Sequence, residues 1–234
     1  GELINTYGYG LPEGARKLEA LNYYTGETVV IPLDGTKTPQ ENAVRYFEKY
    51  EKLKRTCEAL TELTRETKEE IDYLESVSSS LDIAREESDL VQIKDELREA
   101  GLVKKRGPKD KKSKTVSLPF HYVSSDGFHI YVGKNNLQNE ELTFHFASGS
   151  DLWFHAKGIP GSHVIVKTDG QPKEALPDRL FEEAAGLAAY YSKGRGSDKV
   201  EIDYVEKRQV KKVNGGKPGF VIYHTNYSMV ASPS

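Results

Sequence analysis

The segment from Asp151 to His163 combines the residue types with the widest range of chemistry in this sequence. It reads Asp-Leu-Trp-Phe-His-Ala-Lys-Gly-Ile-Pro-Gly-Ser-His and holds the only tryptophan of the chain. Backbone N–H groups of a Gly/Pro-rich turn can form an anion-binding nest. Four side chains could add hydrogen-bond donors to it: His155, Lys157, Ser162 and His163. The segment therefore predicts a site for phosphate or a nucleotide. The alternative is a tight crossover between two core strands, with backbone carbonyls satisfying the histidines.

Two further uses of His155 and His163 are a metal site and acid–base catalysis, because imidazole serves in both. No carboxylate or cysteine lies at a usual metal-ligand spacing from them. Ser162 and His163 are adjacent, and adjacent residues of a strand point to opposite faces, which disfavours a nucleophile–base pair. We expect no catalytic residue, no cofactor and no metal. A His-based enzyme or metal site is kept as an alternative.

A second candidate loop follows an aromatic run, in the sequence Phe-His-Ile-Tyr-Val-Gly-Lys-Asn-Asn-Leu-Gln-Asn that ends at Asn139. Lys134, Asn135 and Asn136 suit hydrogen bonds to the phosphates and base edges of RNA. Asparagines are equally suited to capping a turn through their own side chains. Both interpretations stay open at this point.

Basic side chains also gather after a predicted helix and near the C-terminus. They are Lys193 and Arg195, and then Lys207, Arg208, Lys211 and Lys212. Such cations displace counterions from an RNA backbone. Basic residues are also common on solvated edge strands, so these clusters are not a specific signal of nucleic-acid binding.

The net charge of −3 is unevenly distributed along the chain. Residues 36–100 carry −6, whereas residues 101–118 carry +6. The basic, apolar-poor stretch over 104–118 predicts a flexible linker. The lone Cys57 excludes an intramolecular disulfide and fits a reducing cytoplasm. No run of about 18 apolar residues occurs, so we expect no membrane span.

The elements before this linker predict a helical arm. Residues 1–37 predict a small β-hairpin around Thr25-Gly26-Glu27 and the remnant of a preceding region, because the chain begins without Met. Thr38-Pro39-Gln40-Glu41 predicts a helix start with a capping box. A heptad seam then runs through Tyr46, Tyr50, Leu53, Cys57, Leu60, Thr64, Thr67, Ile71, Leu74, Ser78 and Leu81.

This spacing predicts a coiled-coil arm over 38–103. Leu90, Ile93 and Leu97 continue it after a break near 79–88, so a second helix could fold back as an antiparallel helical hairpin. An exposed seam could also pair with a second copy, giving a dimer through the coiled coil.

From Phe120 onward the apolar period changes to two, which predicts strands. The expected strands are Phe120–Val123, Phe128–Val132, Leu142–Phe146, Leu152–His155, Val164–Lys167, Val200–Lys207 and Phe220–His224. Pro177–Tyr191 predicts an amphipathic helix. The fold class is therefore α+β: a helical arm followed by a compact mixed domain over 119–234 with a mainly antiparallel sheet.

Both candidate loops resemble the NFACT-R domain, and so does Lys217-Pro-Gly-Phe-Val-Ile-Tyr near the end. The hairpin at 22–34 and the helix start at 39–47 resemble the middle of bacterial NFACT-family members. The resemblance covers nearly the whole chain. One departure is Gly158, where many members are expected to carry an acidic residue.

The resemblance implies a cytoplasmic ribosome-rescue factor rather than an enzyme. Its expected partners are obstructed large ribosomal subunits, through rRNA or ribosomal protein, and tRNA, in support of C-terminal alanine tailing. We expect the family's tRNA-handling N-terminal domain and helix-hairpin-helix region to be missing from this sequence, so this chain should not support tailing alone. An alternative, suggested by the older family name, is a surface adhesin that binds fibronectin.

Overall fold

The computed structural model describes residues 1–104 and 116–234. Residues 105–115 of the predicted basic linker lie outside the described residues. Contacts divide the chain into two compact units, Gly1–Lys68 and Glu69–Ser234. The division into an arm, a linker and a domain stays a prediction.

The first unit is built around a β-hairpin. Strands β1 (Lys17–Asn22) and β2 (Glu27–Pro32) pair antiparallel, which confirms the predicted hairpin. Helix α1 (Glu2–Tyr7) and the turn η1 (Gly8–Gly10) precede it. Its small core consists of Ile4, Leu18, Ala20 and Ala43.

Helix α2 spans Pro39–Ile83 and begins where its capping residues predict. The backbone N–H of Thr38 donates to Glu41 Oε2 over 2.7 Å, and that of Glu41 donates to Thr38 Oγ1 over 3.2 Å. This reciprocal pair confirms the capping box, because it satisfies two N–H groups that a helix start leaves free.

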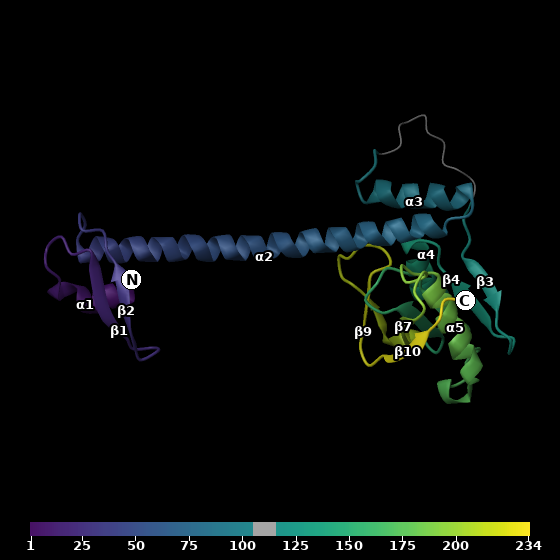
Figure 1. Ribbon diagram of the computed structural model, residues 1–234. Coiled ribbons are helices and arrows are strands. Elements are labelled where there is room, and N and C mark those ends of the chain that lie inside the picture. Colours follow the sequence, from purple (N-terminus) through teal and green to yellow (C-terminus); the bar gives the residue numbers. More distant parts are fainter. Residues whose placement is uncertain (105–115) are drawn as a thin grey trace. The chain divides into compact units, whose positions relative to one another are not determined.

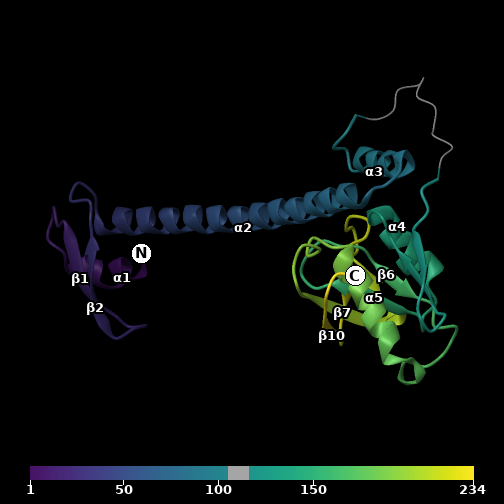
Figure 2. The same cartoon turned by 45° about the vertical axis from the view of Figure 1, so that its right-hand side comes forward.

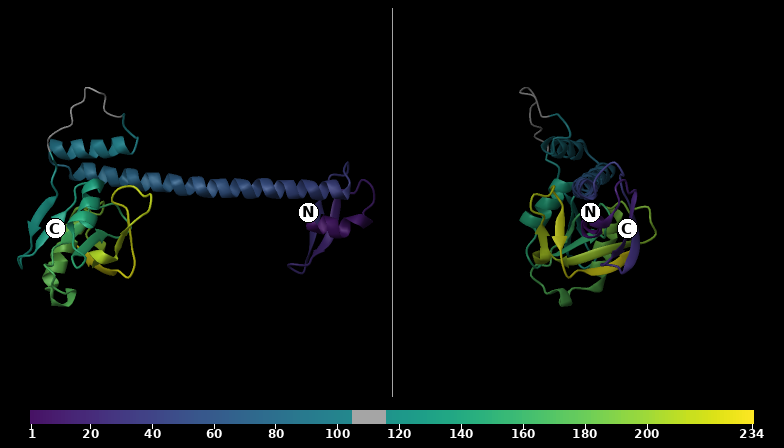
Figure 3. Two further views of the ribbon diagram at one scale, coloured as in Figure 1. Left: turned by 180° about the vertical axis from the view of Figure 1, so that it is seen from behind. Right: turned by 90° about the vertical axis from the view of Figure 1, so that its left-hand side faces the viewer.

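Helix α3 (Glu87–Glu99) lies beside the last turns of α2, as the predicted helical hairpin requires (Figure 1; Figure 3, left). The packed residues differ from the prediction. Tyr73 and Val77 of α2 are buried with Ile93 of α3, whereas the seam residue Leu74 is 44% exposed. The seam was therefore wrong by one position here, because α2 turns its apolar surface toward both α3 and the adjoining domain.

The second unit contains a six-stranded sheet in the order β10-β7-β5-β6-β4-β3, with every neighbouring pair antiparallel. This confirms the α+β class and the mainly antiparallel sheet. The strands are β3 (Phe120–Val123), β4 (His129–Val132), β5 (Leu152–Ala156), β6 (Val164–Val166), β7 (Val200–Glu206) and β10 (Tyr227–Ala231).

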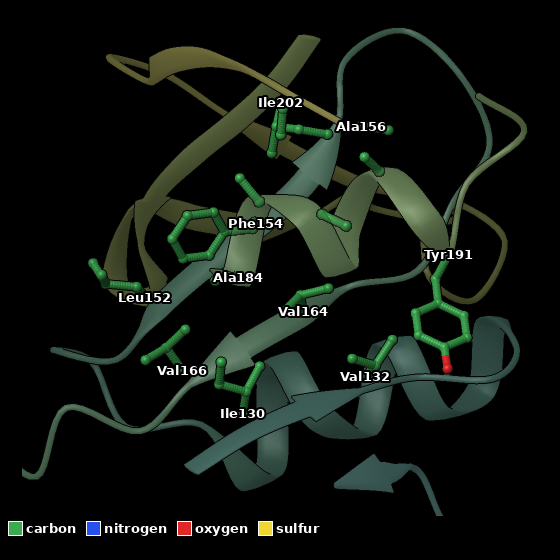
Figure 4. Close-up of a cluster of buried hydrophobic side chains, with 14 of the residues drawn as sticks. Ile130, Val132, Leu152, Phe154, Ala156, Val164, Val166, Ala184, Tyr191 and Ile202 are labelled. Atoms are coloured by element: carbon green, nitrogen blue, oxygen red, sulfur yellow. The ribbon is translucent and has the colours of Figure 1, made fainter. Parts of the chain in front are cut away.

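Helix α5 (Asp178–Tyr190) covers one face of this sheet (Figure 2). Its alanines bring the helix close to the strands, and Ala184 lies in the same buried cluster as Phe154 and Val164 (Figure 4). The opposite face is covered in part by helix α4 (Asn136–Glu141), the π-helical turn η2 (Leu142–Phe146) and the hairpin of β8 (Val210–Lys212) and β9 (Val221–Tyr223). Two short turns, η3 (Lys173–Ala175) and η4 (Lys207–Gln209), complete the unit.

The predicted strand at Leu142–Phe146 is wrong, because these residues continue α4 as η2. The alternation of apolar residues suits a strand, but Asn135 caps a helix immediately before it and Leu142 and Thr143 are buried under the sheet. Tertiary packing thus overrides the local preference. Among the described residues, no helix is apolar and long enough to cross a membrane.

Candidate nucleic-acid interface

The loop with Lys134, Asn135 and Asn136 lies against α3 rather than in solvent. The three residues are only 7%, 1% and 4% exposed. Asn135 caps α4 by accepting from the backbone N–H of Gln138 over 2.9 Å. The capping role considered for this loop is therefore present, and RNA contact by these residues stays a prediction.

Asp89 of α3 is the centre of this contact. Its carboxylate is fully buried and accepts from Lys134 Nζ over 3.0 Å and from Ser117 Oγ over 2.5 Å. The backbone N–H groups of Arg85 and Glu86 donate to its other oxygen. Burial acts to raise the pKa of Asp89, but the hydrogen bonds outweigh it and hold the pKa below its usual value.

Two more polar residues of α3 continue the contact along the same helix face. Gln92 Oε1 accepts from Asn135 Nδ2 and Gln138 Nε2, each over 2.8 Å. Glu96 Oε1 accepts from Asn136 Nδ2 over 2.9 Å. Asp89, Gln92 and Glu96 are spaced three and four residues apart, so one stripe of the helix contacts the whole loop.

His155 and His163 come together at a pocket of about 340 Å³. Their ring centroids lie 5.5 Å apart in an edge-to-face arrangement, with the Trp153 indole against both. The other walls come from the 158–161 turn and from the start of β9. The strand–turn–strand segment predicted from the sequence therefore brings both imidazoles to one site.

The contacts of His163 are with neutral groups. Its Nδ1 lies 2.7 Å from Thr143 Oγ1 and 3.2 Å from the carbonyl oxygen of Asn139. Burial lowers the pKa of His155 and takes that of His163 well below the usual value. Both rings are therefore neutral at pH 7.

The rim of this pocket is acidic. Asp72 and Glu75 of α2 line it, whereas Lys157 faces elsewhere and pairs with Glu201 at 2.5 Å. Ser162 is buried, and its backbone N–H donates to the carbonyl of Tyr191 over 2.8 Å. Acidic rims repel phosphate, so the pocket itself does not favour the anion-binding interpretation.

No group of three or more potential ligands in residues 1–104 and 116–234 could hold a metal ion. Among the described residues, His155 and His163 therefore do not form a metal-binding group with a third His, Cys, Asp or Glu side chain. The hydrogen bonds of His163 instead resemble those of a satisfied core histidine.

The predicted basic residues lie on two separate surfaces. Lys193 pairs with Glu75 at 2.9 Å, beside the pocket, and Arg195 lies over the Tyr190 ring at 3.9 Å. The other cluster follows β7 and continues into β8: Lys207, Arg208, Lys211 and Lys212. Of these, Arg208 pairs with Glu206 and Lys212 with Glu140.

Sequence reasoning missed an exposed row of rings next to the second cluster. His121 and His129 stack at 5.0 Å, His121 and Tyr131 at 4.6 Å, and Tyr131 meets Phe146 edge-on at 4.6 Å. Alternation in β3 and β4 could have shown that the first three share a face. The position of Phe146 could not be found this way, because its segment is helical.

Comparisons with known proteins cover the entire chain. A model of the NFACT N-terminal and middle domains matches residues 1–116, and one of the NFACT protein RNA binding domain matches residues 118–224. The chain is 44% identical to the Rqc2 homolog RqcH of Streptococcus pneumoniae over 234 residues, all of this chain and 41% of that protein. The Bacillus subtilis counterpart is 40% identical over 237 residues, all of this chain and 40% of that protein. The chain thus spans about two fifths of these relatives.

A solved structure also matches. It is described as the C-terminal of the fibronectin/fibrinogen-binding protein from Streptococcus suis (FBPS), and the match has a TM-score of 0.74 at 45% identity. It covers 83% of this chain and 77% of that one.

Proposed function

Since this chain belongs to the NFACT family, we propose that it is the ribosome-binding part of a ribosome-associated quality-control factor. The observation that carries the proposal is the RNA-binding domain model over residues 118–224, joined to similarity with RqcH proteins along the full chain. The chain acts in the cytoplasm by binding RNA and has no catalytic step of its own.

In this proposal the partners are obstructed large ribosomal subunits and tRNA. Cations of the second unit support RNA binding, above all the exposed Lys211 and the half-buried Lys207, since cations on a surface displace counterions from phosphates. This chain covers about two fifths of its RqcH relatives. In a protein as long as those relatives, C-terminal alanine tailing would also require the other three fifths.

The test is cosedimentation of the chain with purified large ribosomal subunits at increasing salt. Binding should be present at low salt and weaken steeply as salt rises, because released counterions drive it. A chain lacking residues 1–68 keeps the compact unit Glu69–Ser234 whole and should retain RNA binding. No cosedimentation, or affinity unchanged by salt, would overturn the proposal.

A double variant and a control variant test whether Lys207 and Lys211 contact the phosphates. Lys207→Gln with Lys211→Gln should lower the slope of log affinity against log salt by roughly 1.4 on single-stranded RNA, about 0.7 for each lost phosphate contact. Lys157→Gln is the control, because this lysine is already paired with Glu201.

The alternative function is fibronectin binding, the property for which the Streptococcus suis protein of the solved structure is named. Immobilised fibronectin should not retain the folded chain under conditions in which large subunits do. Specific retention on fibronectin together with no binding to subunits would replace the proposed function by an adhesin.

A further inference from the structure

The open end of the sheet carries an aromatic row, defined as His121, His129, Tyr131 and Phe146. His121 and His129 are exposed, Tyr131 is half-buried and Phe146 is 42% exposed. The strand register explains why the first three rings share a face: His121 lies opposite Tyr131, and His129 opposite Val123. The covering elements α4 and η2 end at Phe146, which leaves these strands open on this side.

The rings contact one another in sequence. The His121 ring lies nearly parallel to that of Tyr131, with an angle of 13° and a centroid distance of 4.6 Å. His121 Nε2 and His129 Nδ1 lie 2.8 Å apart, so one ring donates a hydrogen bond to the other. Each ring thereby holds its neighbour in place, and the row has little conformational freedom to lose when a ligand binds.

A lysine ammonium group lies over each of the two phenylalanine rings of η2. Lys167 Nζ lies 5.0 Å from the Phe146 centroid, and Lys207 Nζ lies 5.7 Å from that of Phe144. Lys167 also pairs with the buried carboxylate of Asp151. The 148–151 loop then connects the row to the second basic cluster, because the backbone N–H of Lys207 donates to the carbonyl of Asp151 over 2.8 Å.

We propose that the aromatic row is a stacking platform for unpaired bases of a single-stranded RNA segment, with Lys207 and the neighbouring cations holding its phosphates. This inference rests on the proposed RNA-binding function and names the surface that performs it. Aromatic faces beside a positive surface match the chemistry of single strands, whose bases are free to stack. In a duplex the bases already stack on one another, so duplex RNA gains little from the platform.

Both the charge and the shape of the aromatic row indicate which ligand it binds. A protein partner would use the exposed rings as an apolar patch and would not require Lys167 over Phe146 or Lys207 over the neighbouring Phe144. Nucleotides use both features at once, since each carries a flat base and a phosphate. The histidine pocket is lined by Asp72 and Glu75, and Lys193 pairs only with Glu75 of these two. The pocket therefore offers no excess of positive charge, and the row is the surface favoured for RNA.

The experiment measures binding of the full chain to a fluorescent twelve-nucleotide oligouridine and to a blunt RNA duplex of the same length. The test variant is His121→Ala with Phe146→Ala. It should bind the single strand at least about 5-fold more weakly, since one base–ring stack corresponds to roughly 5- to 150-fold in affinity. Its binding to the duplex should stay within about 2-fold of the unaltered chain's.

Two controls separate stacking from folding and from general apolar contact. Val230→Ala removes a side chain that is 60% exposed on β10, at the other edge of the same sheet, and should leave affinity unchanged. Phe146→Tyr keeps a ring and should retain binding, whereas Phe146→Leu keeps apolar bulk and should not. The salt slope should be the same for the unaltered chain and for the double alanine variant, because no cation is lost.

Photocrosslinking with 4-thiouridine in the oligouridine gives a second readout that does not depend on any variant. Crosslinks should map to peptides with Tyr131 and Phe146. If the unaltered chain binds no RNA, the proposed function and the platform both fail. If it binds RNA but the double variant binds equally well, or crosslinks map only around the histidine pocket, the platform alone is overturned.

Discussion

Lys134 Nζ lies 3.0 Å from Oδ1 of Asp89, and the two side chains are almost completely shielded from water. These residues are 45 positions apart. Their contact joins α3 to the loop that the sequence offered as an RNA-binding candidate.

The first prediction concerns this ion pair. Asp89→Asn should lower the free energy of unfolding by about 3 to 5 kcal/mol, because removing one member of a buried pair leaves the other charge without compensation. Urea denaturation measures it. Glu75→Gln, at the exposed pair with Lys193, is the control and should cost less than about 1 kcal/mol. Equal losses in the two variants would contradict a special role for the buried pair.

The second prediction tests which residues of α2 pack. Val77 is 4% exposed whereas Leu74, on the predicted seam, is 44% exposed. Val77→Ala should therefore lower the free energy of unfolding by about 1 to 3 kcal/mol through lost burial and a cavity. Leu74→Ala should change it by less than about 0.5 kcal/mol. Thermal or urea denaturation measures both losses. A larger loss for Leu74→Ala than for Val77→Ala would support the predicted heptad register instead.

The third prediction is a pH dependence due to His163. Burial takes the pKa of this ring well below its usual value in the folded chain, so below pH 6.5 the unfolded chain binds the proton first. The stability contributed by the neutral ring is present above pH 6.5 and is lost as pH falls toward the folded-state pKa. Between pH 7.5 and 5.5 the loss should be about 1 kcal/mol.

The measurement compares urea denaturation of the unaltered chain and His163→Gln at both pH values. The variant should lack this part of the pH dependence. Burial raises the pKa of Glu96, so that carboxyl contributes in the opposite direction: stability increases as pH falls through its raised folded-state pKa. Because Glu96 is present in both proteins, its effect cancels in the comparison. An identical pH dependence in the two would show that His163 is not the titrating group.

The fourth prediction concerns the exposed seam of α2. Leu60, on the seam, and Leu63, off it, are each 56% exposed. If the seam pairs with a second copy, the chain should dimerise with rising concentration, and Leu60→Gln should shift that equilibrium toward monomer. Leu63→Gln is the matched control and should not. Sedimentation equilibrium measures both, and a monomer at all concentrations would exclude the dimer.

Local chemistry determined much of this protein from sequence alone. The capping box at Thr38 and Glu41 set the start of α2, because those contacts span three residues and need no distant partner. Alternation over Phe120–Val132 likewise predicted the β3–β4 hairpin. The motif around His155 and His163 predicted that both imidazoles belong to one segment, and its likeness to NFACT-R identified the family.

Only the tertiary structure determined which residues pack against each face of these elements. Lys134, Asn135 and Asn136 have the composition of a solvated RNA loop, yet α3 covers them through Asp89 and Glu96. Leu142–Phe146 has the alternation of a strand but forms a helical turn, and this places Phe146 beside Tyr131. Periodicity determines which side chains share a face, whereas the partner of that face comes from contacts between residues far apart in the chain.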